Sequence, residues 1–82
     1  MKMTTKQLEK VFYQEPFQPF SVRLENGEEI LVKKPRKVSI SADQVAIVGL
    51  TRLPSGAQRQ GLRFLPLKLI ESAFHIDSDS LP

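Results

Sequence analysis

Apolar residues recur along this chain with two different spacings, and the first is helical. Near the N-terminus Leu8, Val11 and Phe12 are three or four positions apart, behind a Thr-x-x-Gln sequence that has the form of a capping box. This spacing predicts one amphipathic helix over residues 4–14. The helix has to end there, because Pro16 cannot continue it.

The segment Glu-Pro-Phe-Gln-Pro-Phe, residues 15–20, leads out of the helix. Each proline fixes its own φ and pushes the residue before it toward extended geometry. The segment also contains a PxxP pattern, which aromatic grooves bind in the polyproline conformation, but this pattern is very common by chance. Because two phenylalanines can serve as apolar anchors and a strand begins at once, we interpret the segment as a stiff joint.

From residue 19 the spacing changes to alternation of apolar and polar residues, which is typical of a half-buried strand. Asn26-Gly27 follows and is a strong hairpin signal. We therefore predict a hairpin with strands over residues 19–25 and 28–34.

Two registers of this hairpin are possible. A two-residue type I′ loop would leave Ile30 and Val32 on the solvent side. A type I turn followed by a left-handed glycine bulge instead places Val22 opposite Ile30 and gathers the apolar residues of both strands on one face. We predict the bulged register, which leaves Leu31 on the outer side.

The second half of the chain is divided into short elements by prolines and glycines. We predict strands over residues 44–50, 57–65 and 72–77, one helical turn over residues 67–70 and a frayed tail over residues 78–82. Leu-Pro-Ser-Gly at 53–56 fits a type I turn. The strand over residues 44–50 should be buried on both faces or nearly so. In the last strand, alternation places Phe74 and Ile76 inward and His75 outward.

Before these strands, residues 33–37 are basic, contain Pro35 and predict an exposed crossing, after which Val38 and Ile40 lean inward. A helix, five short antiparallel strands and a helical turn before the last strand follow the order of an SH3-like or Sm-like small barrel. The fold class is α+β, mainly β, and closing the sheet protects its edges. With 82 residues the chain has room for one core, so residues 1–82 are predicted to form a single domain.

The run PF-x-PF-x-V-x-L-x-N-G, residues 16–27, resembles a group of short uncharacterised bacterial proteins that begin with a small helix. The resemblance covers about the first half of the chain and implies a small β-barrel of unassigned function, with no functional residues to transfer. The helix and Leu-Glu-Asn-Gly at 24–27 are also similar to Sm-like RNA-binding proteins. Members of that class carry a basic-glycine motif in the fourth-to-fifth strand region, which residues 64–69 lack.

Charge indicates one possible partner. The formal net charge is +3, and between residues 33 and 68 many basic residues stand against the single acid Asp43. The basic residues that could follow a phosphate backbone are Lys33, Lys34, Arg36, Lys37, Arg52, Arg59 and Arg63. The one aromatic residue among them, Phe64, is expected in the core. Weak, salt-sensitive binding of single-stranded nucleic acid, RNA above all, is therefore the alternative hypothesis.

The leading hypothesis is a non-catalytic interaction module that binds a protein or self-associates. It rests on leucines that the predicted register leaves outside or near strand ends, where they could form one apolar patch. These candidate protein contacts are Leu31, Leu50, Leu53 and Leu62.

The sequence contains no recognisable motif for catalysis or metal binding. It has no cysteine, and its only histidine has neither further ligands nor a nucleophile at a useful spacing. The glycine spacing of residues 56–61 lacks the Lys-Ser/Thr of a phosphate loop and indicates a hairpin tip. Glu28 and Glu29 adjoin a turn and should be solvated. We predict no enzyme activity, no cofactor, no metal and no small-molecule substrate.

The first residues contain no apolar run of signal-peptide length, and no stretch approaches the roughly 18 apolar residues of a membrane span. We therefore expect a soluble, cytoplasmic protein without membrane contact.

Overall fold

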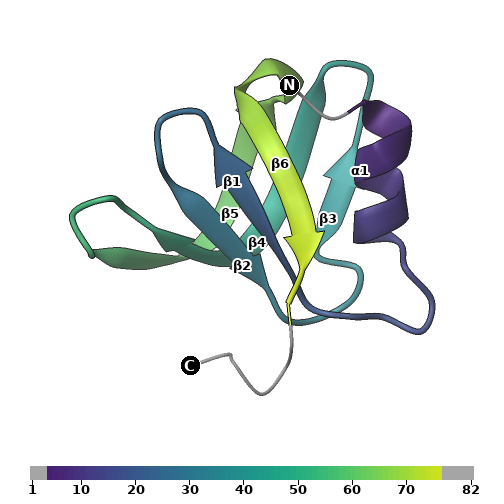
Figure 1. Cartoon of the computed structure of the whole chain (residues 1–82), viewed down its shortest axis with the longest axis horizontal. Helices are drawn as coiled ribbons and strands as arrows, with labels where there is room; N and C mark the ends of the chain where they lie inside the picture. Colours follow the sequence, from purple (N-terminus) through teal and green to yellow (C-terminus); the bar gives the residue numbers. More distant parts are fainter. Residues whose placement is uncertain (1–3, 77–82) are drawn as a thin grey trace.

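The computed structural model describes residues 4–76, which form one short helix and a curled antiparallel sheet of six strands (Figure 1). The elements in chain order are α1 (Thr5–Phe12), β1 (Phe20–Leu24), β2 (Glu29–Val32), β3 (Val38–Ile40), β4 (Gln44–Arg52), β5 (Gln58–Pro66), the 3-10 turn η1 (Leu67–Leu69) and β6 (Ile70–His75). The predicted mainly β fold is confirmed. The tail over residues 78–82 and the end of the last predicted strand at Asp77 lie outside the described residues.

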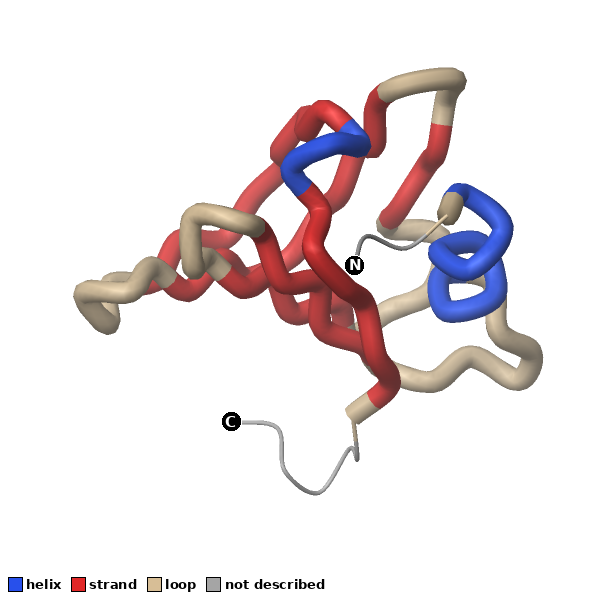
Figure 2. The backbone as a smooth tube through the Cα atoms, turned by 45° about the horizontal axis from the view of Figure 1, so that its top comes forward, coloured by secondary structure: helices blue, strands red, loops and turns tan. Residues whose placement is uncertain are grey.

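The sheet is organised around β4, which has partners on both of its edges. The order is β3-β4-β2-β1-β6, and β5 pairs along the other edge of β4 over its whole length. On its first edge β4 pairs with β3 near its beginning and with β2 near its end. The strands therefore curl into a half-barrel, from which the tip of the β4–β5 hairpin projects (Figures 1 and 2).

The helix α1 begins with the predicted capping box. The Thr4 hydroxyl accepts a hydrogen bond from the Gln7 backbone N–H at 3.2 Å, and the Gln7 side chain accepts one from the Thr4 N–H at 2.8 Å. The helix ends at Phe12, two residues earlier than predicted, and buries Leu8 and Phe12 against the sheet. No helix among residues 4–76 is long and apolar enough to cross a membrane.

The β1–β2 hairpin has the predicted bulged register. The Gly27 N–H donates to the Leu24 carbonyl at 3.0 Å, and Gly27 has a φ of 91°, which completes a type I turn with a left-handed glycine. Val22 consequently lies opposite Ile30. The expected exposure of Leu31 was wrong: Leu31 lies outside the core cluster but is only 5% exposed. It belongs to an interior strand of the sheet, β2, which has β1 on one edge and β4 on the other.

The β4–β5 hairpin uses the same turn. The Gly56 N–H donates to the Leu53 carbonyl at 2.9 Å, and Gly56 has a φ of 95°, so the predicted type I turn at 53–56 is confirmed. The predicted hairpin tip at 56–61 is correct only at its beginning, because residues 58–61 already belong to β5.

One short strand, β3, was not predicted. Its residues Val38 and Ile40 lean inward as expected and pack, half-buried, against the core. They lie opposite Ile47 and Val45 of β4. Three residues are too few to show a period of two in the sequence, so only the pairing with β4 reveals this strand.

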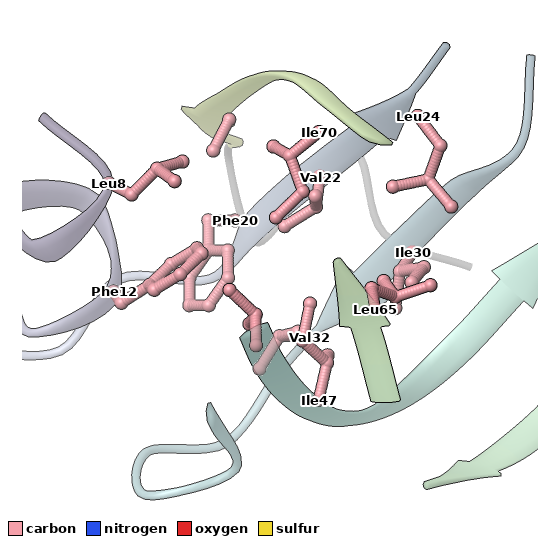
Figure 3. Packing of buried hydrophobic residues seen from close by; sticks show 12 residues of the cluster. Leu8, Phe12, Phe20, Val22, Leu24, Ile30, Val32, Ile47, Leu65 and Ile70 are labelled. Atoms are coloured by element: carbon pink, nitrogen blue, oxygen red, sulfur yellow. The ribbon is translucent and has the colours of Figure 1, made fainter. Parts of the chain in front are cut away.

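The core lies between α1 and the concave face of the sheet (Figure 3). Phe20 is fully buried at its centre, and its ring centroid lies 5.0 Å from that of Phe12 and 6.2 Å from that of Phe17. The helix also contributes Leu8, and the other buried members come from every strand except β3: Val22, Leu24, Ile30, Val32, Val45, Ile47, Leu65, Ile70 and Ala73. Phe17 packs against this cluster, which agrees with the joint interpretation of the proline segment.

The last strand presents the opposite face from the one predicted. Arg23 lies opposite Ser72 but Leu24 lies opposite Ile70, so β6 has one extra residue at this point. Such a bulge reverses the alternation that follows it. Ala73 therefore enters the core, whereas Phe74, predicted to point inward, lies on the outer face and is 38% exposed.

Candidate functional site

A groove lies where β4 changes its partner strand. Pairing with β3 extends to Ile47, and pairing with β2 begins at Leu50, so Val48 and Gly49 lie between the two partners. The groove has a volume of about 360 Å³ and opens on the outer face, by which we mean the face of the sheet opposite the core. We call it the basic groove; its lining residues are Leu31, Lys33, Lys34, Lys37, Val48, Gly49, Leu50 and Gln60.

The basic groove combines an apolar floor with positively charged walls. Leu31 and Leu50 lie opposite each other on neighbouring strands and form part of the floor. The lysines come from the end of β2 and the crossing to β3, where they are exposed. The Val48 N–H donates to the Lys37 carbonyl at 2.8 Å, which holds the crossing beside β4. The groove therefore presents several cations beside apolar surface and favours an anionic occupant.

The edge strand β5 carries exposed apolar side chains on the same outer face. Leu62 is 56% exposed and Phe64 is 63% exposed, although Phe64 was expected in the core. The reason is the pairing register: Leu65 lies opposite the buried Val45 and points inward, so its neighbour Phe64 must point outward. Among the described residues, β4 is the only strand that pairs with β5.

A second pocket, of about 480 Å³, lies along residues 59–63 of β5, beside the β1–β2 turn and the end of β4. Its lining residues are Glu28, Thr51, Leu53, Arg59, Gln60, Gly61, Leu62 and Arg63. Arg63 Nη1 lies 2.6 Å from Glu28 Oε2, and the Glu28 side chain is only 13% exposed. Glu28 was predicted to be solvated, but this ion pair ties it to β5 and so joins the β1–β2 turn to the far strand.

The environment of Glu28 lowers its pKa. Partial burial acts to raise the pKa, but hydrogen bonds from Arg63 and Asn26 and the positive charges of Arg63 and Arg59 outweigh burial. The carboxylate is therefore held in its charged form. Its neighbour Glu29 pairs with Arg23 at 3.3 Å and is half-buried, so it too is not simply solvated.

Acidification is expected to weaken the Glu28–Arg63 pair. Folding lowers the pKa of Glu28, so the ionised carboxylate stabilises the folded protein at pH values above the ordinary pKa of glutamate. This contribution is lost as the pH falls through the lowered pKa of the folded state. Between about pH 5 and pH 3, the wild type should lose up to about 1 kcal/mol more unfolding free energy than Glu28→Gln. Urea denaturation across this range measures the difference, and identical pH profiles would contradict the assignment.

The structure separates the predicted basic contacts into groups. Lys33, Lys34 and Lys37 line the basic groove, and Arg36 lies on the same crossing, exposed, with a φ of 63°. Arg59 and Arg63 line the second pocket instead. Arg52 is half-buried in β4, opposite Glu29. The seven residues therefore do not form a single surface.

The predicted apolar contacts are also divided. Leu31 and Leu50 form part of the floor of the basic groove, and Leu62 is exposed on β5. Leu53 lies in the second pocket, which Leu62 also borders. The sequence missed the exposure of Phe64, and nothing in its alternation could have assigned a face to it without the pairing partner of β5.

Other candidate chemistry has structural explanations. His75 is exposed, and its Nε2 lies 3.2 Å from the Val11 carbonyl oxygen, to which it donates in the tautomer that carries a proton there, so it connects β6 to α1. Within residues 4–76, no three His, Cys, Asp or Glu side chains gather as a metal site would require. No protein-family model matches this chain, and no significant match was found among curated proteins or solved structures.

Proposed function

We propose that this protein is a non-catalytic interaction module, an SH3-like or Sm-like small barrel, that binds another protein chain by strand addition at β5. The chain it binds is either a partner protein or a second copy of itself. The observation that carries the proposal is an edge strand of nine residues with two large exposed apolar side chains, Leu62 and Phe64.

The backbone of β5 supports this function. An edge strand presents a row of N–H and C=O groups that can pair with an added strand, while alternate side chains supply specificity. Natural edges of this length are often protected by charge, and β5 does contain Arg59 and Arg63. Arg63, however, forms an ion pair with Glu28, which offsets its charge. The outer face of β5 between Gln60 and Phe64 carries no charged residue at all.

A second copy can bind this edge with good complementarity. Antiparallel pairing of two β5 strands about Leu62 would place Phe64 of one copy opposite Gln60 of the other. Both Leu62 side chains and both Phe64 side chains would then lie on one continuous outer face. Arg63 would lie opposite Gly61, which has no side chain to clash with it. This arrangement is isologous, as expected for a two-fold dimer.

Replacing Leu62 with glutamine is expected to abolish self-association. The change removes exposed apolar surface at the centre of the proposed contact without adding charge. Light scattering from about 5 to 500 micromolar should show the wild type moving from monomer to dimer and Leu62→Gln remaining monomeric. Tyr13→Gln is the matched control, because Tyr13 is 52% exposed but lies at the end of α1, and it should dimerise like the wild type.

If the wild type stays monomeric, the partner is a different protein. Affinity capture from the native host with the same three proteins as baits then tests the proposal. Specific partners should be lost with Leu62→Gln and retained with Tyr13→Gln. Strand addition at β5 is contradicted if the wild type is monomeric and all three baits capture the same partners.

A further inference from the structure

The basic groove and the exposed ring of Phe64 lie on the same outer face of the sheet. The Lys37 carbonyl contacts the Val48 N–H, Val48 lies opposite Leu62, and Phe64 is two residues beyond Leu62 on β5. On the other side of Val48, Leu50 marks the far end of the groove floor. From the Leu50 row to the Phe64 row is four residues along β4, or about 13 Å at the rise of a strand.

The charged side chains of the basic groove have one sign. The residues that line the basic groove include three lysines and no acid. Lysine is a compact charge on a flexible stem, suited to follow a backbone of phosphates but not to read bases in a fixed geometry. A span of about 13 Å matches roughly four stacked nucleotides at 3.4 Å each. The surface from the basic groove to Phe64 therefore has the length to contact several phosphates, and the groove lysines supply the positive charge.

Phe64 offers a surface on which a base can stack, which the lysines do not. A base can stack on an exposed aromatic ring whatever its sequence, and such stacking adds substantially to the binding of single strands. An acidic peptide would satisfy the lysines equally well but offers no regular series of planar rings to Phe64. Duplex nucleic acid keeps its bases stacked inside and leaves Phe64 without a base to contact.

We infer that the basic groove binds single-stranded nucleic acid, with phosphates beside Lys33, Lys34 and Lys37 and a base stacked on Phe64. The inference does not depend on the proposed strand addition at β5. Binding should be weak and tolerant of sequence, because the groove supplies charge and stacking without a fixed set of base-reading groups.

Fluorescence anisotropy with labelled twelve-residue oligo-dT and oligo-U at several salt concentrations tests the inference. The logarithm of the binding constant should fall linearly with the logarithm of salt concentration. Each phosphate contact contributes about 0.7 to the slope, so the double variant Lys33→Ala with Lys37→Ala should reduce it by about 1.4. The matched control is Lys6→Ala with Lys10→Ala, which removes the same charge from exposed positions on α1 and should leave the slope unchanged.

The stacking contact has its own test. Phe64→Leu should weaken binding about tenfold with little change in the salt slope, whereas Phe64→Tyr should bind like the wild type. Circular dichroism confirms that each variant is folded. Leu62→Gln retains the lysines and Phe64, so it should still bind the oligonucleotides even if it loses its protein contact.

Three results would overturn the inference. The first is no detectable binding at about 50 mM salt, where phosphate contacts are strongest. The second is an equal loss of slope for the groove and helix double variants, which would indicate attraction by net charge alone. The third is an oligo-glutamate of equal charge that competes as well as the oligonucleotides, which would assign the groove to acidic peptides.

Discussion

Replacing Phe20 with alanine is expected to lower the free energy of unfolding by about 4 kcal/mol, the usual cost of removing a buried phenylalanine. Phe20 is fully buried and packs its ring against those of Phe12 and Phe17. It therefore joins α1, the proline joint and β1 in one contact. Because a small domain is stable by only about 5–10 kcal/mol, this variant should be close to unfolding at 25 °C.

Urea denaturation with Phe74→Ala as the control measures this effect. Phe74 also lies on a strand beside β1, opposite Ser21, but on the outer face, where it is 38% exposed. Its ring lies under the Arg23 guanidinium at 5.8 Å, a contact of about 0.5–1 kcal/mol at an exposed site. Phe74→Ala should therefore cost only about 1 kcal/mol. Equal losses for the two variants would contradict the assignment of faces.

Gly49→Ala is expected to cost about 3 kcal/mol, at the upper end for added volume in a packed site. A Cβ on Gly49 would collide with the backbone carbonyl oxygen of Leu31 and would lie 3.1 Å from Cγ2 of Ile30. The carbonyl belongs to β2 and cannot turn away as a side chain would. The strands β2 and β4 would have to separate where the basic groove lies between them.

Gly56→Ala provides the comparison for Gly49→Ala. Among residues 4–76 nothing lies within 4 Å of a Cβ at Gly56, so the cost comes from its left-handed φ of 95° and should be about 1–2 kcal/mol. Thermal or urea unfolding should rank Gly49→Ala as clearly less stable than Gly56→Ala. The reverse order would mean that β2 and β4 are not in close contact at Gly49.

The turns of this fold could be predicted from sequence because their chemistry is local. Asn26-Gly27 and Ser55-Gly56 each place a glycine where the backbone needs a positive φ, and the apolar spacing around the first turn chose the correct register. The capping box of α1 is equally local. These features need no knowledge of what lies across the sheet.

The faces of β5 and β6 could not be predicted, because they depend on partners far away in the chain. One extra residue in β6 reverses the alternation that placed Phe74 inward. Phe64 and Leu65 are adjacent and both apolar, so only the pairing with β4 shows which one points outward. Both errors concern residues whose face is fixed by register.

The candidate site could be predicted only in part, because the sequence does not show which distant residues come together. The basic residues were recognisable as a group, but the sequence does not indicate that three lysines line one groove while Arg59 and Arg63 line another pocket. Nor does it indicate the ion pair between Glu28 and Arg63, which are 35 residues apart. The groove itself exists because β4 changes partners, which is a property of the sheet and not of any local motif.

Amide hydrogen exchange along β5 tests the central claim, strand addition at this edge, most directly. The amides of residues 58–65 that do not bond to β4 should exchange fast in dilute protein and should slow at high concentration or with a captured partner. Exchange in the short edge strand β3 should not change. Protection that appears elsewhere on the protein while the β5 amides remain fast would contradict the claim.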